Sequence, residues 1–310
     1  MRFFKKTNID FLGVRRRWYI VSSSLIIAGF ISLFIKGIDL GIDFKGGTEL
    51  VFSFSRTIEI ADLRAALGKV GLEKSEIKSY GTEGDVLIRT TEQAEGMVLG
   101  DKMKQAIQQA FPDLKFEVLK QYKIGPKIGE ELRRGAVYAI AASLIAILAY
   151  VAVRFQFVYG LGAVLALFHD VLVTLGFLSI LDGWVPGLNL EITQEVVAAF
   201  LTIVGVSVND TVVIFDRIRE NLKIYRSLSL SEVMNRSLND TLSRTIITNG
   251  TILTVLVVLL FFGGEVNRAF ALTLTIGEIT GTYSSIYVAS ALVLDVTERK
   301  KRLLNPGRAE

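Results

Sequence analysis

One carboxylate and one guanidinium stand out because they lie within or beside apolar segments. Asp210 is set inside residues 196–220, VVAAFLTIVGVSVNDTVVIFDRIRE, a run long enough to cross a bilayer. Arg244 opens another apolar segment, in which Thr248 and Asn249 follow it. Because a charge at membrane depth is costly, such side chains face the interior of a helix bundle and pair with one another. We therefore predict that Asp210 and Arg244 meet across adjacent antiparallel helices.

Two interpretations of this pair remain open. In the first, Asp210 and Arg244 form a structural ion pair that locks two helices together. In the second, Asp210 gains and loses a proton in turn, and Arg244, which keeps its charge, acts as the gate. Moving one charge through the membrane field is worth about 2.3 kcal/mol per 100 mV. Only a titrating group uses that energy by carrying a proton.

Further polar residues in the apolar segments are candidates for an additional relay or for a polar core: Asn209, His169, Asp170, Glu278 and Thr248. His169 and Asp170 would suit a proton relay, because histidine titrates near neutrality, but a polar contact that holds two helices together is the simpler interpretation. Glu278 is either a second titrating carboxylate or a group that pairs or extends to the membrane surface. Gly277 and Gly281 form a G-x-x-x-G pattern around Glu278, which is typical of close helix packing.

Several kinds of chemistry are not expected. The chain has no cysteine and a single histidine, so neither a thiolate nor a histidine metal site is predicted. No G-x-x-x-x-G-K-[ST] loop for a nucleotide occurs, and no serine triad is supported. The basic residues behind the pI of about 9.1 adjoin apolar segments, so they indicate membrane orientation and no nucleic-acid partner. We predict no enzyme activity and no cofactor.

The elements that must position these residues follow from hydropathy. About half of the chain is hydrophobic and its mean hydropathy is +0.45, which is typical of a membrane protein. Six segments are long and apolar enough to span a bilayer: 18–35, 135–153, 155–181, 196–215, 245–262 and 269–296. The first follows a basic stretch, 1–17, and no cleavage site follows it, so we predict an uncleaved signal anchor. The last five make up a transmembrane domain, 128–296.

The basic clusters predict the orientation. An even number of spans places both ends of the chain on one side, and the clusters beside the spans all fall on that side. We therefore predict a cytoplasmic N-terminus, a cytoplasmic tail at 297–310, and a polar region at 39–127 on the outer, periplasmic side.

That polar region has a pattern of its own. Its periodicity predicts strands at 48–54, 76–80, 85–90 and 115–121 and helices at 60–70 and 93–111. The order βαββαβ is the ferredoxin-like, α+β arrangement. Gly46 and Gly47, at its start, are either an exit turn or a binding loop, and the turn is favoured. The predicted protein is thus a polytopic α-helical membrane protein with six transmembrane helices and one such domain between the first two.

Six motifs in order carry a resemblance: GIDFKGGT at 41–48, IGPKIGEEL at 124–132, ALFHDV at 166–171, VSVNDTVVIFDRIREN at 206–221, SRTIITNGT at 243–251 and GTYSSIYVASAL at 281–292. Together they resemble the SecF subunits of the bacterial Sec protein translocase, in the SecD/SecF family, which is related to the resistance-nodulation-division transporters. The resemblance covers nearly the whole chain.

The resemblance implies a role in protein export across the bacterial inner membrane. It implies that the chain pairs with SecD and that the two use the proton-motive force to assist translocating polypeptides that leave the SecYEG channel. The proton-coupling positions fall on Asp210 and Arg244. The chain departs from the family pattern at Val206, where an aromatic residue is expected, and at Glu278, where an apolar one is expected.

Two other functions stay open at this stage. One is a proton-driven exporter of small molecules or lipids from the broader superfamily. The other is a non-catalytic scaffold that stabilises the translocase, with Asp210 and Arg244 as a structural ion pair.

Overall fold

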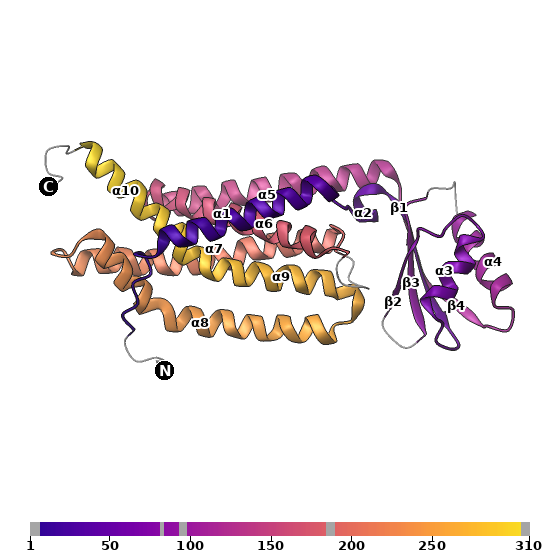
Figure 1. The fold of residues 1–310 in the computed structure, drawn as a ribbon. Coiled ribbons are helices and arrows are strands. Elements are labelled where there is room, and N and C mark those ends of the chain that lie inside the picture. Colours follow the sequence, from indigo (N-terminus) through magenta and orange to yellow (C-terminus); the bar gives the residue numbers. More distant parts are fainter. Residues whose placement is uncertain (1–6, 81–83, 93–97, 184–189, 305–310) are drawn as a thin grey trace.

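A long helical bundle carries a small α+β domain at one end (Figure 1). The computed structural model describes residues 7–80, 84–92, 98–183 and 190–304. Six helices in these ranges are long and apolar enough to cross a membrane. They are α1 (Arg15–Lys36), α5 (Pro126–Arg154), α6 (Phe157–Leu181), α7 (Gln194–Ile224), α8 (Leu230–Phe262) and a last one made of α9 (Gly264–Ser284), a π-helical turn (Ser285–Ser290) and α10 (Ala291–Leu304). The predicted six spanning helices are confirmed.

Several helices continue beyond the apolar segments that predicted them. α5 already begins at Pro126, and α7 and α8 extend until only residues 225–229 separate them. A capping box starts α8, in which Ser229 and Glu232 each satisfy the backbone N–H of the other. Arg217 of α7 also pairs with Asp240 of α8 at 2.8 Å. Caps and polar pairs thus keep the charged ends helical where apolar packing no longer does.

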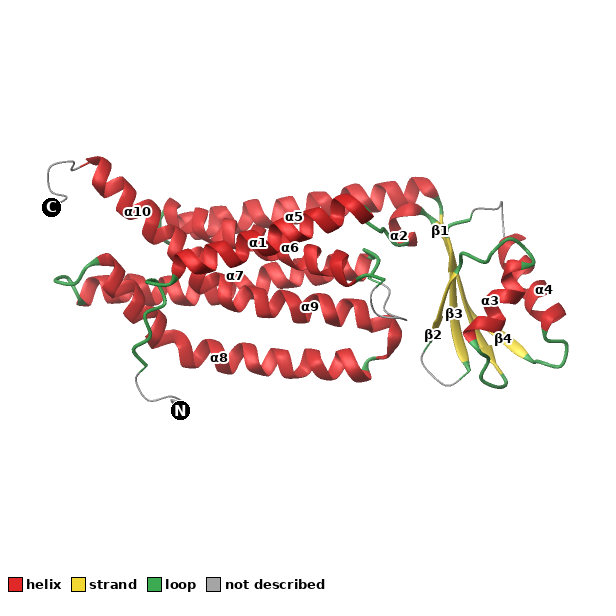
Figure 2. Cartoon of the chain, in the orientation of Figure 1, coloured by secondary structure: helices red, strands yellow, loops and turns green. Residues whose placement is uncertain are grey.

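The small domain lies between α1 and α5 in the chain (Figure 2). Its elements are α2 (Ile42–Lys45), β1 (Gly47–Phe54), α3 (Ile60–Gly68), β2 (Glu76–Ser79), β3 (Asp85–Thr90), α4 (Val98–Ala110) and β4 (Phe116–Ile124). The sheet order is β2-β3-β1-β4 with every pair antiparallel, and α3 and α4 pack on one face over a core that includes Leu50, Phe52 and Met103. This is the split βαβ order that the periodicity predicts. Part of the predicted helix at 93–111, residues 93–97, lies outside the described residues.

The segment that leaves α1 ties the domain to the bundle. The backbone N–H of Gly41 donates to the backbone carbonyl of Ile192 at 2.9 Å. The backbone N–H of Ile192 donates to the backbone carbonyl of Asp39 at 2.8 Å. Asp43 Oδ2 accepts from the backbone N–H of Gln194, the first residue of α7, at 2.9 Å. Burial raises the pKa of this carboxyl. The domain therefore sits against the end of the bundle where α7 begins.

Gly46 and Gly47 form the turn into the sheet. Gly46 ends α2 with a φ of 78°, a conformation that side chains disfavour. A Cβ atom at Gly47 would lie 2.5 Å from the Thr90 carbonyl oxygen of the neighbouring strand. Both glycines are thus required by backbone geometry, which agrees with the turn interpretation.

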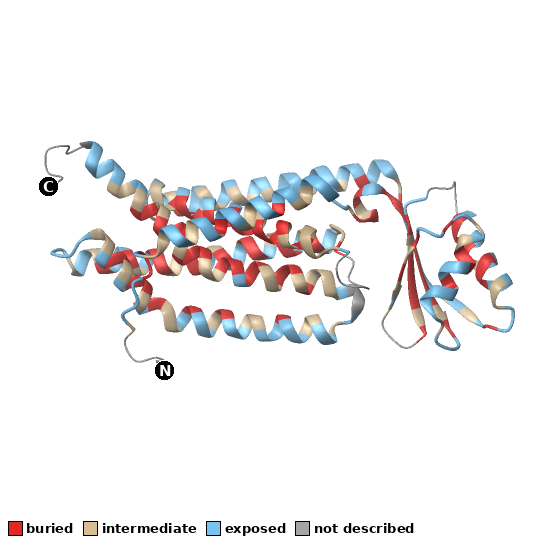
Figure 3. Cartoon of the chain, viewed as in Figure 1, coloured by how far each residue is buried: buried red, intermediate tan, exposed pale blue. Residues whose placement is uncertain are grey.

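The bundle has an inner and an outer set of helices. Buried positions concentrate on α6, α7 and α9, whereas α1, α5 and α8 expose most of their surface (Figure 3). Phe34, Val153 and Phe262 are examples of strongly exposed apolar side chains on the outer set. Such exposure is expected of helices that face lipid or another membrane subunit. Apart from Ser22 of α1, the buried polar residues of the bundle lie on the inner helices and on α8.

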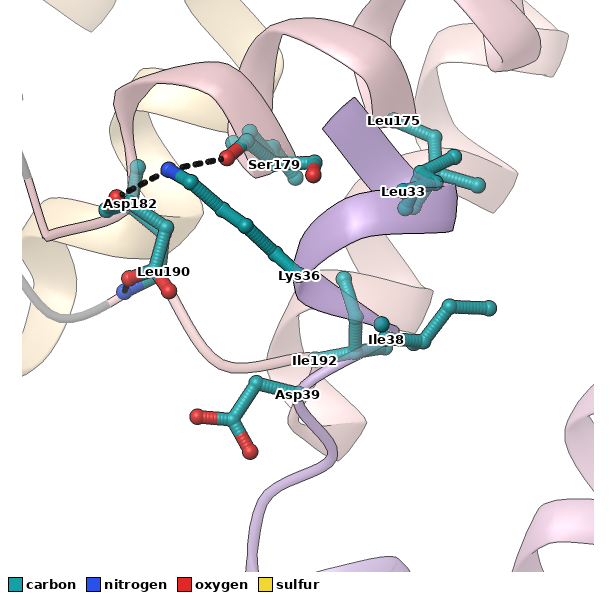
Figure 4. Close-up of a pocket in the computed structure, with 11 residues that line it drawn as sticks. Leu33, Lys36, Ile38, Asp39, Leu175, Ser179, Asp182, Leu190 and Ile192 are labelled. Carbon is teal, nitrogen blue, oxygen red and sulfur yellow. Dashed lines mark hydrogen bonds between the residues drawn. The ribbon is translucent and has the colours of Figure 1, made fainter. Parts of the chain in front are cut away.

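A pocket of about 320 Å³ opens where α1 and α6 end (Figure 4). Lys36 extends across it and its ammonium donates to the carbonyls of Ser179, Ile180 and Asp182, at 3.0, 3.3 and 2.8 Å. These carbonyls belong to the last turn of α6, which lacks intrahelical donors. Lys36 therefore caps α6, and its three N–H donors are already in use.

Candidate functional site

Asp210 lies in a polar centre built by three helices, and we call Asp210, Asn249, Glu278 and Thr282 the Asp210 centre. Asp210 of α7 is 7% exposed and accepts a hydrogen bond from Asn249 Nδ2 of α8 at 2.5 Å. The same nitrogen donates to Thr282 Oγ1 of α9 at 2.8 Å. The Thr282 hydroxyl in turn donates to the backbone carbonyl of Glu278 at 2.7 Å. One amide thus joins the three helices.

This centre has fewer donors than acceptors. Asn249 Oδ1 and Glu278 Oε1 are buried, and neither accepts a hydrogen bond from any described residue. Glu278 is only 6% exposed, and the charge of Asp210 acts on it. Buried acceptors without donors are costly, and a protonated carboxyl would supply an O–H donor. The arrangement is therefore chemically suited to binding and releasing a proton.

The predicted contact between Asp210 and Arg244 is wrong for this structure. Arg244 is exposed on α8, and no ion pair joins it to Asp210. It still acts on Asp210 electrostatically. Asn249 contacts Asp210 and lies five residues beyond Arg244, so the Cα atom of Arg244 is roughly 7.5 Å along α8 from that level. Asn249, and not Arg244, is therefore the residue of α8 that contacts Asp210.

Two other predicted members of the polar core lie elsewhere. Asn209 is exposed although Asp210 next to it is buried, because successive residues of a helix point about 100° apart. Thr248 is half-buried, and its carbonyl accepts from Thr251 Oγ1 at 2.7 Å. Neither side chain belongs to the Asp210 centre.

His169 and Asp170 of α6 form a second centre, which we call the Asp170 centre together with Ser207, Tyr283 and Ser284. Asp170 is fully buried. His169 Nδ1 lies 3.0 Å from Asp170 Oδ1, and the hydroxyls of Ser207 and Ser284 donate to Asp170 Oδ2 at 2.7 and 2.9 Å. Both carboxylate oxygens thus have donors, and the carboxylate joins α6 to α7 and α9.

The ring of His169 is held on its other side as well. Its Nε2 lies 3.0 Å from the hydroxyl of Tyr283, which is itself 3.5 Å from Ser22 Oγ of α1. Ser207, Tyr283 and Asn249 were not predicted as site residues. A helical spacing would have indicated Ser207, which lies three residues before Asp210 and therefore on a neighbouring face.

Small residues bring the helices of both centres together. A Cβ atom at Gly277 would lie 2.1 Å from Ile203 Cδ1, and one at Gly281 would lie 3.0 Å from Ser207 Cβ. The predicted close packing at this G-x-x-x-G pattern is confirmed. Gly29 of α1 and Gly176 of α6 make a similar approach that the sequence did not indicate.

No cluster of three or more histidine, cysteine, aspartate or glutamate side chains that could hold a metal ion is found within the described ranges. The functional candidates are therefore the carboxyl groups themselves and the donors around them.

The chain is similar to known protein-export components. Residues 102–299 match the family described as "Protein export membrane protein SecD/SecF, C-terminal", and residues 31–58 match "SecD/SecF GG Motif". A "Protein translocase subunit SecF" of Rhodothermus marinus is 47% identical over 299 residues, which are 96% of either chain. The subunit of that name in Haemophilus influenzae is 38% identical, over 96% of this chain and 89% of the relative.

A solved structure shows the same architecture. The crystal structure of SecDF, a translocon-associated membrane protein from Thermus thermophilus, superposes with a TM-score of 0.79 at 38% identity. The superposition covers 94% of the present chain but 39% of the SecDF chain. The present chain thus corresponds to less than half of that polypeptide.

Proposed function

The chain belongs to the SecD/SecF family of protein export membrane proteins and is a Sec accessory subunit of the SecF type, and we propose that it uses the proton-motive force to promote polypeptide translocation. In this proposal Asp210 is the residue that binds and releases the proton. The supporting observation is its geometry: a buried intramembrane carboxylate with one amide donor, beside the buried Glu278 with no donor for Oε1. A group that is costly in either charge state suits a switch.

We further propose that SecD supplies the other half of the working unit. Arg244 and Asn209 are exposed in the isolated chain, although both lie in membrane-spanning helices. A guanidinium that faces hydrocarbon costs several kcal/mol, roughly 2.5–3.5 on insertion scales. A membrane partner that covers this face of α7 and α8 would remove the cost. The greater length of the SecDF relative is consistent with such a partner.

The proposed orientation places the small domain in the periplasm and both termini in the cytoplasm of a bacterial inner membrane. The start of α1 and the end of α10 lie at the end of the bundle opposite the sheet (Figure 1). The basic residues of that end support the orientation: Arg15, Arg16, Arg17, Arg217, Arg219, Lys223, Arg299, Lys300 and Lys301. In this orientation the domain faces polypeptides that emerge from SecYEG.

Substitution of Asp210 tests the proton role. Asp210→Asn keeps the shape and an acceptor for Asn249, but it does not titrate. In inverted membrane vesicles that contain the chain with SecD and SecYEG, we expect normal assembly and loss of the export stimulation that a proton gradient provides. Separate H⁺ and Na⁺ gradients would identify the coupling ion.

The matched control is Asp216→Asn, which changes an exposed carboxylate on the same helix. This control should retain full stimulation. Stimulation of the Asp210→Asn complex at the wild-type level would contradict the proposed function, and loss of assembly would favour the scaffold interpretation.

A further inference from the structure

Glu278 occupies a particular level in the bundle. The close contacts of Gly277 with Ile203 and of Gly281 with Ser207 show that α9 runs alongside α7 in the same direction. Glu278 is therefore level with Val204, six residues before Asp210, which is roughly 9 Å along the helix axis. Since α7 begins beside the small domain, Glu278 lies on the domain side of Asp210.

The polar groups of the three helices thus follow one another along the bundle axis. From the domain end, Glu278 comes first, Asp210 with Asn249 and Thr282 comes next, and Arg244 lies beyond them. Thr282 and Asn249 occupy the interval between the two carboxyl groups, because Thr282 follows Glu278 by one turn and Asn249 contacts both Thr282 and Asp210.

The hydrogen bonds distinguish the two carboxyl groups. Asn249 presents its N–H groups to Asp210 and Thr282, so Asp210 acts as an acceptor. Glu278 Oε1 and Asn249 Oδ1 have no donor, although both side chains are more than nine-tenths buried. A carboxyl without a donor in a low-dielectric interior is more stable when protonated, and a nearby negative charge on Asp210 adds to this preference. This arrangement fits a proton on Glu278 and a negative charge on Asp210.

We infer that Glu278 is a second proton-binding residue, which takes up the proton on the domain side and passes it to Asp210. The proton leaves Glu278 Oε1, the Thr282 hydroxyl between the two carboxyl groups accepts it and gives up its own, and a carboxylate oxygen of Asp210 binds that proton. The pair of carboxyl groups therefore carries one negative charge before and after the step. The inference rests on the proposed proton-coupling role of Asp210 and extends it. It assigns a role to a carboxylate at a position where the family pattern predicts an apolar residue.

The other titratable groups near the pair already have partners or keep their charge. On α6, His169 and Asp170 are near Gly281, but Asp170 already has three donors. On α8, Arg244 keeps its charge and is exposed. On α9, Tyr283 contacts His169. None of them supplies the donor that Glu278 Oε1 lacks.

Infrared spectroscopy of the full chain with SecD in lipid would test the inference directly. Protonated carboxyl groups absorb apart from carboxylates, and ¹³C-glutamate labelling separates glutamic from aspartic acid. We expect a protonated glutamic acid signal at neutral pH that Glu278→Gln removes. The same substitution should lower gradient-stimulated export several-fold, because Asp210 then receives no proton from the domain side. Asp216→Asn should change neither readout.

The outcomes separate this inference from the proposed function. A wild-type infrared signal and wild-type gradient-stimulated export in Glu278→Gln, together with lost stimulation in Asp210→Asn, would overturn the inference alone. Full stimulation in Asp210→Asn would overturn the proposed function. If Glu278→Gln does not assemble, Glu278→Asp keeps a carboxyl group and should replace the glutamic acid signal by a protonated aspartic acid signal that ¹³C-glutamate does not shift.

Discussion

The two polar centres of the bundle contain similar residues but differ in how their hydrogen bonds are satisfied. In the Asp170 centre, three donors serve one fully buried carboxylate. In the Asp210 centre, one amide nitrogen serves Asp210 and Thr282, and two buried acceptors have no donor. A fully satisfied polar network makes a packing arrangement specific, whereas an incompletely satisfied one changes when a proton arrives. The Asp170 centre therefore holds the helices in place, whereas the Asp210 centre is the one suited to the proposed proton binding.

The largest expected effect is at Asp170. Asp170→Ala leaves His169 and the Ser207 hydroxyl without their acceptor in a buried site and Ser284 with only the Gly281 carbonyl at 3.3 Å, so the free energy of unfolding should fall by about 3–5 kcal/mol. Denaturation in detergent, followed by circular dichroism, would measure this. Asp216→Ala is the surface control and should stay within about 0.5 kcal/mol of wild type. An equally small change for Asp170→Ala would remove the distinction between the centres.

Substitution of Glu278 should increase the free energy of unfolding, in contrast to substitution of Asp170. Because Glu278→Leu removes a buried acceptor that has no donor, the free energy of unfolding should rise by about 1–3 kcal/mol. The same denaturation experiment measures this increase. Asp170→Leu is the matched change in the Asp170 centre, and it should lower the free energy of unfolding. Destabilisation of both variants to a similar degree would show that Glu278 has structural partners after all.

The close packing of α7 against α9 should contribute to the free energy of unfolding. Gly277→Ala places a Cβ against Ile203, and overpacking of this kind costs about 1–3 kcal/mol. Adding Ile203→Ala, which removes all three atoms within 3.0 Å of the new Cβ, should make the combined loss smaller than the sum of the two single losses. Gly205→Ala on α7 is the control, since a Cβ there has no neighbour within 4 Å. Fully additive losses in the double variant would mean that the contact is not the cause.

The smallest effect is expected at the outer edge of the Asp170 centre. Tyr283→Phe removes the hydroxyl that contacts His169 and Ser22, which should lower the free energy of unfolding by about 0.5–1.5 kcal/mol. Gradient-stimulated export should continue, because the Asp210 centre is unchanged. Tyr138→Phe on the exposed face of α5 is the matched control. Complete loss of stimulation in Tyr283→Phe would instead indicate that His169 takes part in proton transfer.

Hydropathy and periodicity sufficed for the six helices and for the order of the sheet domain, because both depend on which residues avoid water. The ends of the helices were harder to predict, since α8 begins at a capping box, well before its apolar segment. In the site, burial of Asp210 was predictable from the cost of an intramembrane charge. Its partner was not, because Arg244 and Asn249 are five residues apart on the same helix, and both the rotation and the level of α8 against α7 decide which of them contacts Asp210.

The sequence by itself determined that a carboxylate would be buried in a helical membrane bundle, and its motifs indicated the family. Only the tertiary structure decided which side chains surround that carboxylate. It separated Asp210 from Arg244, placed Asn249 between three helices, and left Glu278 without a donor. The physical reason is that hydrophobicity is a property of each residue and its neighbours in the chain, whereas hydrogen-bond satisfaction depends on the angle and level at which separate helices pack.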